Sequence, residues 1–321
     1  MLPNRPRYAA RLNAFKLGLS APTTADLLTR AAEAGLDAAD LNYPDHFTGH
    51  TTRELGGLLA DAGLTLNGLA MRYYTDPGFK LGAFTHPDPA TRQAALDLTK
   101  RGLDALAEMG GGVMTLWLGQ DGIDYAFQGD YRAMWDSTIA CLDELCAHSP
   151  NLDIAIEYKP NEPRAFALMP DVATTLLAIR ETGAENLGVT LDFAHVLYAD
   201  EMPAHAAHLV ARHSRLLGVH LNDGYGKRDD GLMVGTVHPI QTLELLVELT
   251  RIGYDGVIYF DTFPDQGGLD PVDEARTNIR LTDRLRTIAA ELAENDALAA
   301  AIARQDAARS MAIVGEALYG A

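Results

Sequence analysis

The feature that most constrains the fold is an alternation of short apolar segments with longer helical segments along nearly the whole chain. Eight short segments rich in Val, Ile, Leu and Phe have the composition of buried strands, and segments with helical periodicity separate them. The predicted strands cover residues 15–19, 39–43, 64–71, 113–118, 154–157, 187–193, 216–221 and 257–260. Eight successive βα units are typical of one α/β fold, the closed (β/α)₈ TIM barrel. We therefore predict a TIM barrel.

The main alternative fold is an open, doubly wound sheet. That fold would require a Gly-rich phosphate-binding turn after an early strand, and the sequence contains none. No segment reads as a linker between domains. We therefore expect a barrel over residues 1–295 and a C-terminal helical arm over residues 296–321, which would form an extra layer on the barrel or a subunit contact.

Composition excludes several classes of partner. Apolar residues make up 47% of the chain and charged residues 22%, as in ordinary globular proteins. No apolar run reaches the roughly 18–20 residues of a membrane span, and residues 1–16 lack the apolar core of a signal peptide. Cys141 and Cys146 point in different directions on one predicted helix, so we expect no disulfide and a cytoplasmic location. The net charge of −18 argues against a nucleic-acid partner.

Ionisable residues end four consecutive predicted strands. Glu157, Asp192 and His220 close the fifth, sixth and seventh strands, and Asp261 follows the eighth. In a barrel these strand ends surround one mouth, where catalytic residues lie. Crowded carboxylates must bind a proton or a cation, and oxygen donors with one imidazole suit a divalent ion, Mn²⁺ ahead of Mg²⁺. We predict a catalytic metal site, although a single Asp at such a position is usually a helix cap.

A second ligand set follows the same strands. Asp192 could bridge to a second ion held also by His195 and Asp229, so we expect one or two ions per subunit. The neighbouring Asp230 could replace Asp229 in this set. The alternative is that both aspartates are solvated loop charges.

Other residues are candidates for sugar binding. Lys159 shares a strand face with Glu157 and would bind hydroxyl or carbonyl oxygens, although the two could form a simple ion pair. Trp117 ends the fourth strand and Phe84 lies in the long loop after the third, and flat aromatic faces pack against the C–H faces of sugars. Trp117 could equally be a core residue. His46, near the end of the second strand, could assist ring opening or be a surface turn residue.

Several of these segments resemble those of the xylose isomerases. Residues 157–164 are similar to the strand of that family that carries a metal ligand and a lysine, residues 79–85 to its loop with a substrate-site Phe, and residues 117–122 to its tryptophan segment. His220 and Asp261 fall where the family has further metal ligands, and Asn222 is an added substrate-site candidate. The resemblance covers roughly residues 64–264.

The resemblance implies a metal-dependent aldose–ketose isomerase that uses Mn²⁺, Mg²⁺ or Co²⁺. A structural ion would be held by Glu157, Asp192, His220 and Asp261, and a catalytic ion by Asp192, His195 and Asp229. Lys159 would stabilise the oxyanion while hydrogen moves between C1 and C2, as hydride or through an enediol. Trp117 and Phe84 would wall this region, and the members of this family usually form homodimers or homotetramers.

Some positions depart from the xylose isomerase pattern. Asp192 stands where that family has Glu, and His220 stands where it has Asp, so the ligand set is more similar to that of bacterial L-rhamnose isomerases. Ketose 3-epimerases share the Glu, Asp and His but usually end the set with Glu, where this chain has Asp261. The alternatives are a ketose 3-epimerase, a metal-dependent lyase acting on oxidised glycosides, an apurinic-site nuclease and a non-catalytic sugar binder. The charge of −18 disfavours the nuclease.

Overall fold

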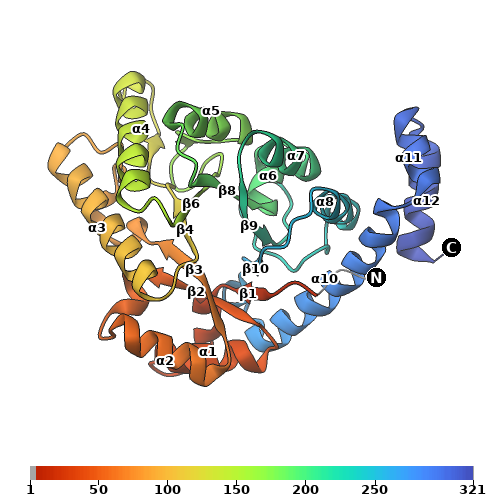
Figure 1. Ribbon diagram of the computed structural model, residues 1–321, viewed down its shortest axis with the longest axis horizontal. Coiled ribbons are helices and arrows are strands. Elements are labelled where there is room, and N and C mark those ends of the chain that lie inside the picture. The colour runs from red at the N-terminus through yellow and green to blue at the C-terminus, as the bar shows by residue number, and fades with distance from the viewer. Residues whose placement is uncertain (1–4, 321) are drawn as a thin grey trace.

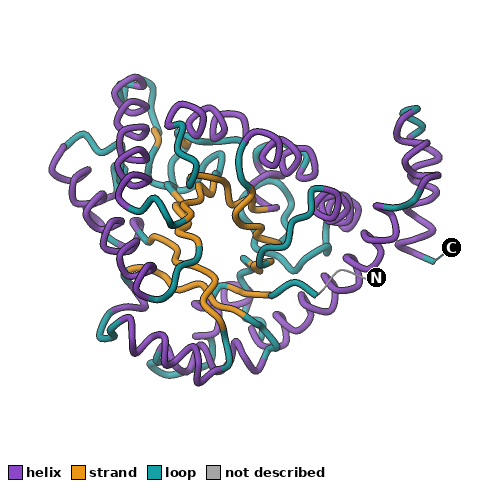
Figure 2. Tube along the Cα trace, viewed as in Figure 1, coloured by secondary structure: helices purple, strands orange, loops and turns teal. Residues whose placement is uncertain are grey.

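Eight parallel strands form the centre of the molecule, and helices surround them (Figure 2). The structure is a computed structural model that describes residues 5–320. The strands of the barrel are β1 (Tyr8–Ala10), β2 (Ala38–Tyr43), β3 (Thr65–Met71), β4 (Val113–Trp117), β6 (Asp153–Glu157), β8 (Leu187–Asp192), β9 (Leu216–Leu221) and β10 (Ile258–Phe260). They pair in the order β1-β10-β9-β8-β6-β4-β3-β2. The Asp37 backbone N–H donates to the Tyr8 carbonyl at 2.9 Å and brings the two ends together, so the predicted barrel is confirmed.

Helices form the outer layer, and most of the long ones begin at a capping Thr or Asp residue. The main ones are α1 (Thr24–Glu33), α2 (Thr52–Ala62), α3 (Pro89–Glu108), α4 (Tyr131–His148), α5 (Val172–Thr182), α7 (Pro203–His213), α8 (Pro239–Arg251) and α10 (Pro271–Ala293), with the short α6 (Phe193–Tyr198) and α9 (Pro264–Gly267) at the mouth. Thr23 and Thr51 each form a reciprocal capping box with the third residue of the helix that follows. Gly63 and Gly183 end α2 and α5 with positive φ, a conformation that glycine adopts without strain.

The prediction of the first strand was wrong. Residues 12–16 form a 3₁₀ helix, η1 (Leu12–Lys16), and the strand lies earlier, at Tyr8–Ala10. The side chains of Leu12 and Phe15 are buried in the core all the same, which explains the apolar pattern. The true strand has only three residues, two of them alanines, and Ala9 packs with Ala38 and Val257 in a small cluster separate from the main core.

The C-terminal helices extend beyond the ring of barrel helices. After α10, the helices α11 (Asp296–Ala303) and α12 (Ala307–Tyr319) project away from the barrel at one side of the molecule (Figure 1). Helix α12 contacts α11 and α10 but has no fully buried residue. The division into a barrel domain and an arm after residue 295 stays a prediction. None of the helices over residues 5–320 is both long and apolar enough to cross a membrane.

Candidate metal centre

Four side chains from neighbouring strands converge at one end of the barrel. Glu157 ends β6, Asp192 ends β8, His220 lies near the end of β9, and Asp261 follows β10 directly. One oxygen or nitrogen atom of each residue lies within 4.8 Å of the corresponding atoms of the other three. The parallel register causes this convergence, because Asp192 is paired with His220 across the β8–β9 ladder and His220 with Tyr259 across the β9–β10 ladder. The structure thus brings together all four residues of the first predicted ligand set.

Hydrogen bonds hold the four side chains in place. His220 Nδ1 lies 3.1 Å from Glu157 Oε1. The fully buried Asn222 donates from Nδ2 to Asp192 Oδ2 at 3.0 Å and to the Asp261 carbonyl at 3.1 Å, and its own Oδ1 accepts the Ala194 N–H at 2.8 Å. Such outer contacts orient metal ligands and tune their basicity. Asn222, predicted from the sequence as a substrate contact, uses its amide here for contacts with Asp192, the Asp261 carbonyl and the Ala194 N–H.

The side chains of this cluster shift one another's pKa values, because they are crowded and largely out of contact with water. Burial and the nearby Glu157 and Asp192 raise the pKa of Asp261 to about 7. Burial alone would lower the pKa of His220, but Glu157 and the other acids outweigh it and raise that pKa to about 10. Burial also raises the pKa of Asp192. Three carboxylates, of which Glu157 and Asp192 are buried and Asp261 is half-buried, fit a hard or borderline divalent ion together with one imidazole, and the ion would replace bound protons.

The second predicted set lies beside the first. His195, in α6, places Nε2 at 3.2 Å from Asp229 Oδ2, and its Nδ1 lies 3.0 Å from the Tyr158 carbonyl. Asp192 accepts the His195 backbone N–H at 2.9 Å and so connects the two sets. Among the described residues, Asp229 Oδ1 is buried without a hydrogen-bond partner. A buried carboxylate oxygen normally has a partner, and a bound cation would supply one here. Asp230 instead faces its own loop and accepts the Tyr225 N–H at 2.8 Å, so Asp229 is the better candidate for a ligand.

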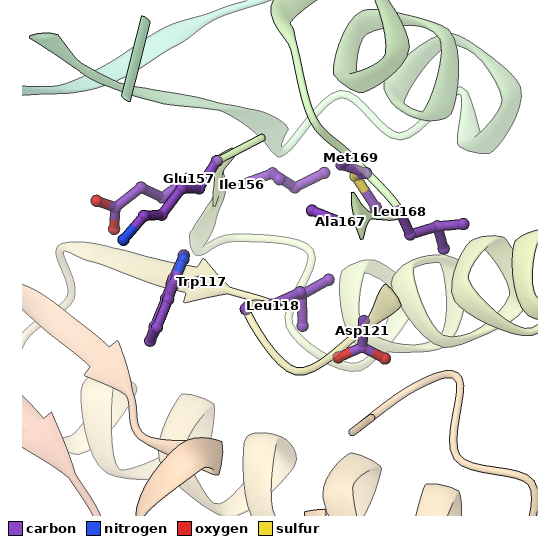
Figure 3. Close-up of a pocket in the computed structure, with 10 residues that line it drawn as sticks. Trp117, Leu118, Asp121, Ile156, Glu157, Ala167, Leu168 and Met169 are labelled. Atoms are coloured by element: carbon purple, nitrogen blue, oxygen red, sulfur yellow. The ribbon is translucent and has the colours of Figure 1, made fainter. Parts of the chain in front are cut away.

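Lys159 is a buried cation next to both sets. Its Nζ lies 3.1 Å from Asp229 Oδ2 and 3.0 Å from Glu162 Oε2, and 5.4 Å from the centre of the Trp117 ring. Burial alone would lower the pKa of Lys159, but the Asp229 and Glu162 carboxylates outweigh it and raise that pKa. Lys159 is therefore positively charged at neutral pH. Figure 3 shows that the side chains of Trp117 and Glu157 extend to the same side of their strands, away from Leu118 and Leu168.

A cavity of about 350 Å³ opens onto these groups. Its lining includes six predicted site residues, namely Trp117, Glu157, Lys159, His195, Asp229 and Asp261. Two predicted substrate contacts lie elsewhere. Phe84 is fully buried against Tyr73, with ring centres 5.7 Å apart, and its N–H donates to Asp121 Oδ1 at 2.8 Å. His46 accepts the Asn42 N–H at 3.0 Å, and burial lowers the pKa of His46 to about 4.

The cavity also has lining residues that the sequence interpretation missed. Arg72 and Tyr74 follow β3, Arg11 follows β1, and Phe263 follows β10. Arg72 could have been found, because it occupies the same strand-end position as the metal ligands do on their own strands. Arg11 could not, since the first strand was placed after it instead of before it.

Comparison with known proteins agrees with this geometry. A family model described as xylose isomerase-like TIM barrel matches residues 28–285. The chain is 31% identical over 209 residues to a xylose isomerase of Thermus thermophilus, which is 63% of this chain and 54% of that relative. It is 29% identical over 247 residues to a xylose isomerase of Thermus caldophilus, which is 72% of this chain and 64% of the relative. The matched region thus spans less than two thirds of either relative.

Solved structures share the fold over most of their length. A D-tagatose 3-epimerase-like protein has a TM-score of 0.72 and 18% identity, covering 89% of this chain and 98% of its own. An L-ribulose 3-epimerase has a TM-score of 0.69 and 17% identity, covering 91% and 98%. At such low identity these structures support the fold alone. The family match covers most of the barrel, and the chain belongs to the xylose isomerase-like TIM barrel family.

Proposed function

We propose that this protein is a divalent-metal-dependent sugar isomerase that interconverts an aldose and a ketose by moving hydrogen between C1 and C2 of the open-chain sugar. The observation that carries the proposal is the position of Lys159, a buried cation that shares a cavity of about 350 Å³ with Glu157 and Asp261 of the candidate metal centre. A fixed positive charge at this place suits a reaction that develops negative charge on a carbonyl oxygen.

Each group of side chains has a distinct task in this proposal. Glu157, Asp192, His220 and Asp261 would hold Mn²⁺, Mg²⁺ or Co²⁺, and His195 with Asp229 would complete a site for a second ion. When bound, the metal would polarise the substrate carbonyl and acidify a neighbouring hydroxyl.

Lys159 would stabilise the developing oxyanion. It acts as a charge and not as a base, because Asp229 and Glu162 keep it protonated. Trp117 and Tyr74, whose rings lie 5.2 Å apart, form an apolar wall that keeps water from the carbons that exchange hydrogen.

The second candidate is a ketose 3-epimerase. Two observations favour it: the structural similarity to proteins of that description, and the presence of two carboxylates, Glu157 and Asp261, in one cluster. Both carboxylates line the cavity, where they could exchange a proton with a substrate carbon. Lys159 disfavours this candidate, because removal and return of a proton by two carboxylates does not require a buried lysine.

The experiment is turnover of a sugar panel by protein stripped of metal with a chelator and reloaded with Mn²⁺. The panel contains xylose, lyxose, mannose, rhamnose, allulose and tagatose, and chromatography separates the products. An aldose and its ketose, formed only with metal, would support the isomerase. Conversion of one ketose into another would replace it with the epimerase, and no conversion of any free sugar would argue against both.

Two sequence-based expectations accompany this proposal. We propose that the protein assembles as a homodimer or homotetramer, with α11 and α12 as the subunit contact, and that it works in the cytoplasm. Light scattering on the full chain and on a chain ending at residue 295 would test the role of the arm in assembly.

A further inference from the structure

Arg72 is the cation of the cavity that has no acidic partner. It follows β3 directly and lines the cavity. Within residues 5–320, no hydrogen bond or ion pair reaches its guanidinium group, and its Nε is buried without a partner. The other Lys and Arg side chains of the lining are paired: Lys159 with Asp229 and Glu162, and Arg11 with Asp265 and with the Thr262 carbonyl at 3.2 Å. A partly desolvated, unpaired charge costs free energy, which an anion in the cavity would recover.

An aromatic wall formed by Tyr74 and Trp117 lies next to this guanidinium. Arg72 Cζ lies 4.3 Å from the centre of the Tyr74 ring, Tyr74 packs edge-to-face on Trp117, and Lys159 Nζ lies 5.4 Å from the Trp117 ring. The ring attracts the positive charge, and within residues 5–320 the guanidinium N–H groups of Arg72 donate no hydrogen bond. A guanidinium with free N–H groups can bind a carboxylate in a bidentate way. Arg72 and Lys159 are therefore the two ends of one series of contacts along the cavity.

We propose that Arg72 binds a carboxylate of the substrate, so that the substrate is a sugar acid of the uronate type and not a neutral sugar. The inference rests on the proposed isomerase and names its substrate class. The carboxylate at Arg72 would direct the carbonyl end of the sugar along the aromatic wall to Lys159 and the metal ligands.

A single carboxylate fits this position better than a phosphate ester. Arg72 offers one unpaired positive charge, which balances a monoanion. Four acidic residues, Glu157, Glu162, Asp229 and Asp261, line the same cavity and would repel a dianion more strongly than a monoanion.

The test compares acids with their neutral parents. Mn²⁺-loaded protein is assayed with D-glucuronate and D-galacturonate, with D-glucose and D-galactose, and with D-glucose 6-phosphate. Four proteins are used: the wild type, Arg72→Met, Arg72→Lys, and the control Arg53→Met, which removes an exposed arginine of α2. Calorimetry of D-glucuronate and D-galacturonate binding to the metal-free proteins gives a measurement that does not depend on turnover.

The expected result is a wild-type preference for a uronate over its parent sugar in kcat/KM. Arg72→Met should lower this preference about 10- to 100-fold, the value of one charged hydrogen-bonded contact. Arg72→Lys should recover part of it, and Arg53→Met should match the wild type. Binding of the preferred uronate to the metal-free protein should weaken by the same factor in Arg72→Met only.

Other outcomes separate the two proposals. Equal losses for acid and neutral sugars in Arg72→Met would reveal a merely structural role and overturn the inference, as would unchanged uronate affinity. A preference for the phosphorylated sugar would overturn the carboxylate assignment. If no sugar is turned over but Arg72→Met still weakens uronate binding, the isomerase fails while the anion site stands.

Discussion

Binding of Mn²⁺ should release protons in a number that depends on pH, because the ligands of the candidate metal centre hold protons in the metal-free protein. The pKa of His220 is raised to about 10 and that of Asp261 to about 7. At pH 6 both residues are protonated, so about two protons should leave when the ion binds. At pH 8 Asp261 is already ionised, and about one proton should leave. Because protons compete with the metal, affinity should rise with pH, by about 1,000-fold between pH 6 and pH 8.

Isothermal titration calorimetry in buffers of different ionisation enthalpy counts these protons directly. His220→Gln should remove about one released proton at each pH and reduce the affinity gain to about tenfold, the share of Asp261. His46→Gln is the matched control. His46 is buried as well, but its pKa is lowered to about 4, so it is neutral over this range and should leave the proton count unchanged.

A count near zero at pH 6 would refute the reasoning, since it would mean that the cluster holds its charges without protons. An unchanged count in His220→Gln would also refute it, because the proton would then reside on a group outside the four ligands. An affinity that falls as pH rises would have the wrong sign for any site built from these residues.

Three further changes should have separable effects. Lys159→Met should lower turnover by about 100- to 1,000-fold, the loss typical of one charge-stabilising group, with metal content by atomic absorption unchanged; retained turnover would remove Lys159 from the mechanism. Asn222→Ala should weaken Mn²⁺ binding by about 10- to 100-fold, because it leaves Asp192 without its orienting amide; calorimetry with unaltered affinity would contradict this. Chelation should lower the melting temperature, and metal at about 100 times its Kd should restore about 2.7 kcal/mol, provided that the ion binds the folded chain alone; identical melting curves would argue against a site in the folded protein.

The barrel could be predicted from the sequence because its signal is repeated. Buried parallel strands are nearly continuous apolar runs, and most of them lie within one or two residues of the predicted positions. The prediction of the first strand was wrong for a physical reason. Its central residue is Ala9, which packs with Ala38 and Val257, while the larger apolar residues nearby, Leu12 and Phe15, belong to a 3₁₀ helix packed in the core. Here the strand carries small residues and the segment after it carries large apolar ones, which is the opposite of the pattern by which strands are usually recognised.

The convergence of the four candidate ligands was predictable for a similar reason, since the fold fixes where the strands end and these residues lie at four strand ends. The positions of loop residues are not fixed by the strands in this way. The sequence left Asp229 and Asp230 equivalent, and their difference arises from a loop conformation in which Asp229 meets His195 and Lys159 while Asp230 accepts the Tyr225 N–H. Phe84 likewise lies in a loop, and its backbone N–H donates to Asp121, which sits in a different segment of the chain.

For Arg72, the position could be predicted from the sequence, but the contacts of its side chain could not. Its position at the end of β3 is given by the same rule that located Glu157 on β6, so its presence in the cavity was accessible from the sequence. The sequence could not show which of the positively charged side chains in the cavity form ion pairs with acidic residues. Three Lys and Arg side chains line the cavity, and only the structure shows that two are paired with acidic residues far along the chain while Arg72 lies over an aromatic ring. The substrate class inferred here depends on that remaining charge, and so on contacts that no local pattern encodes.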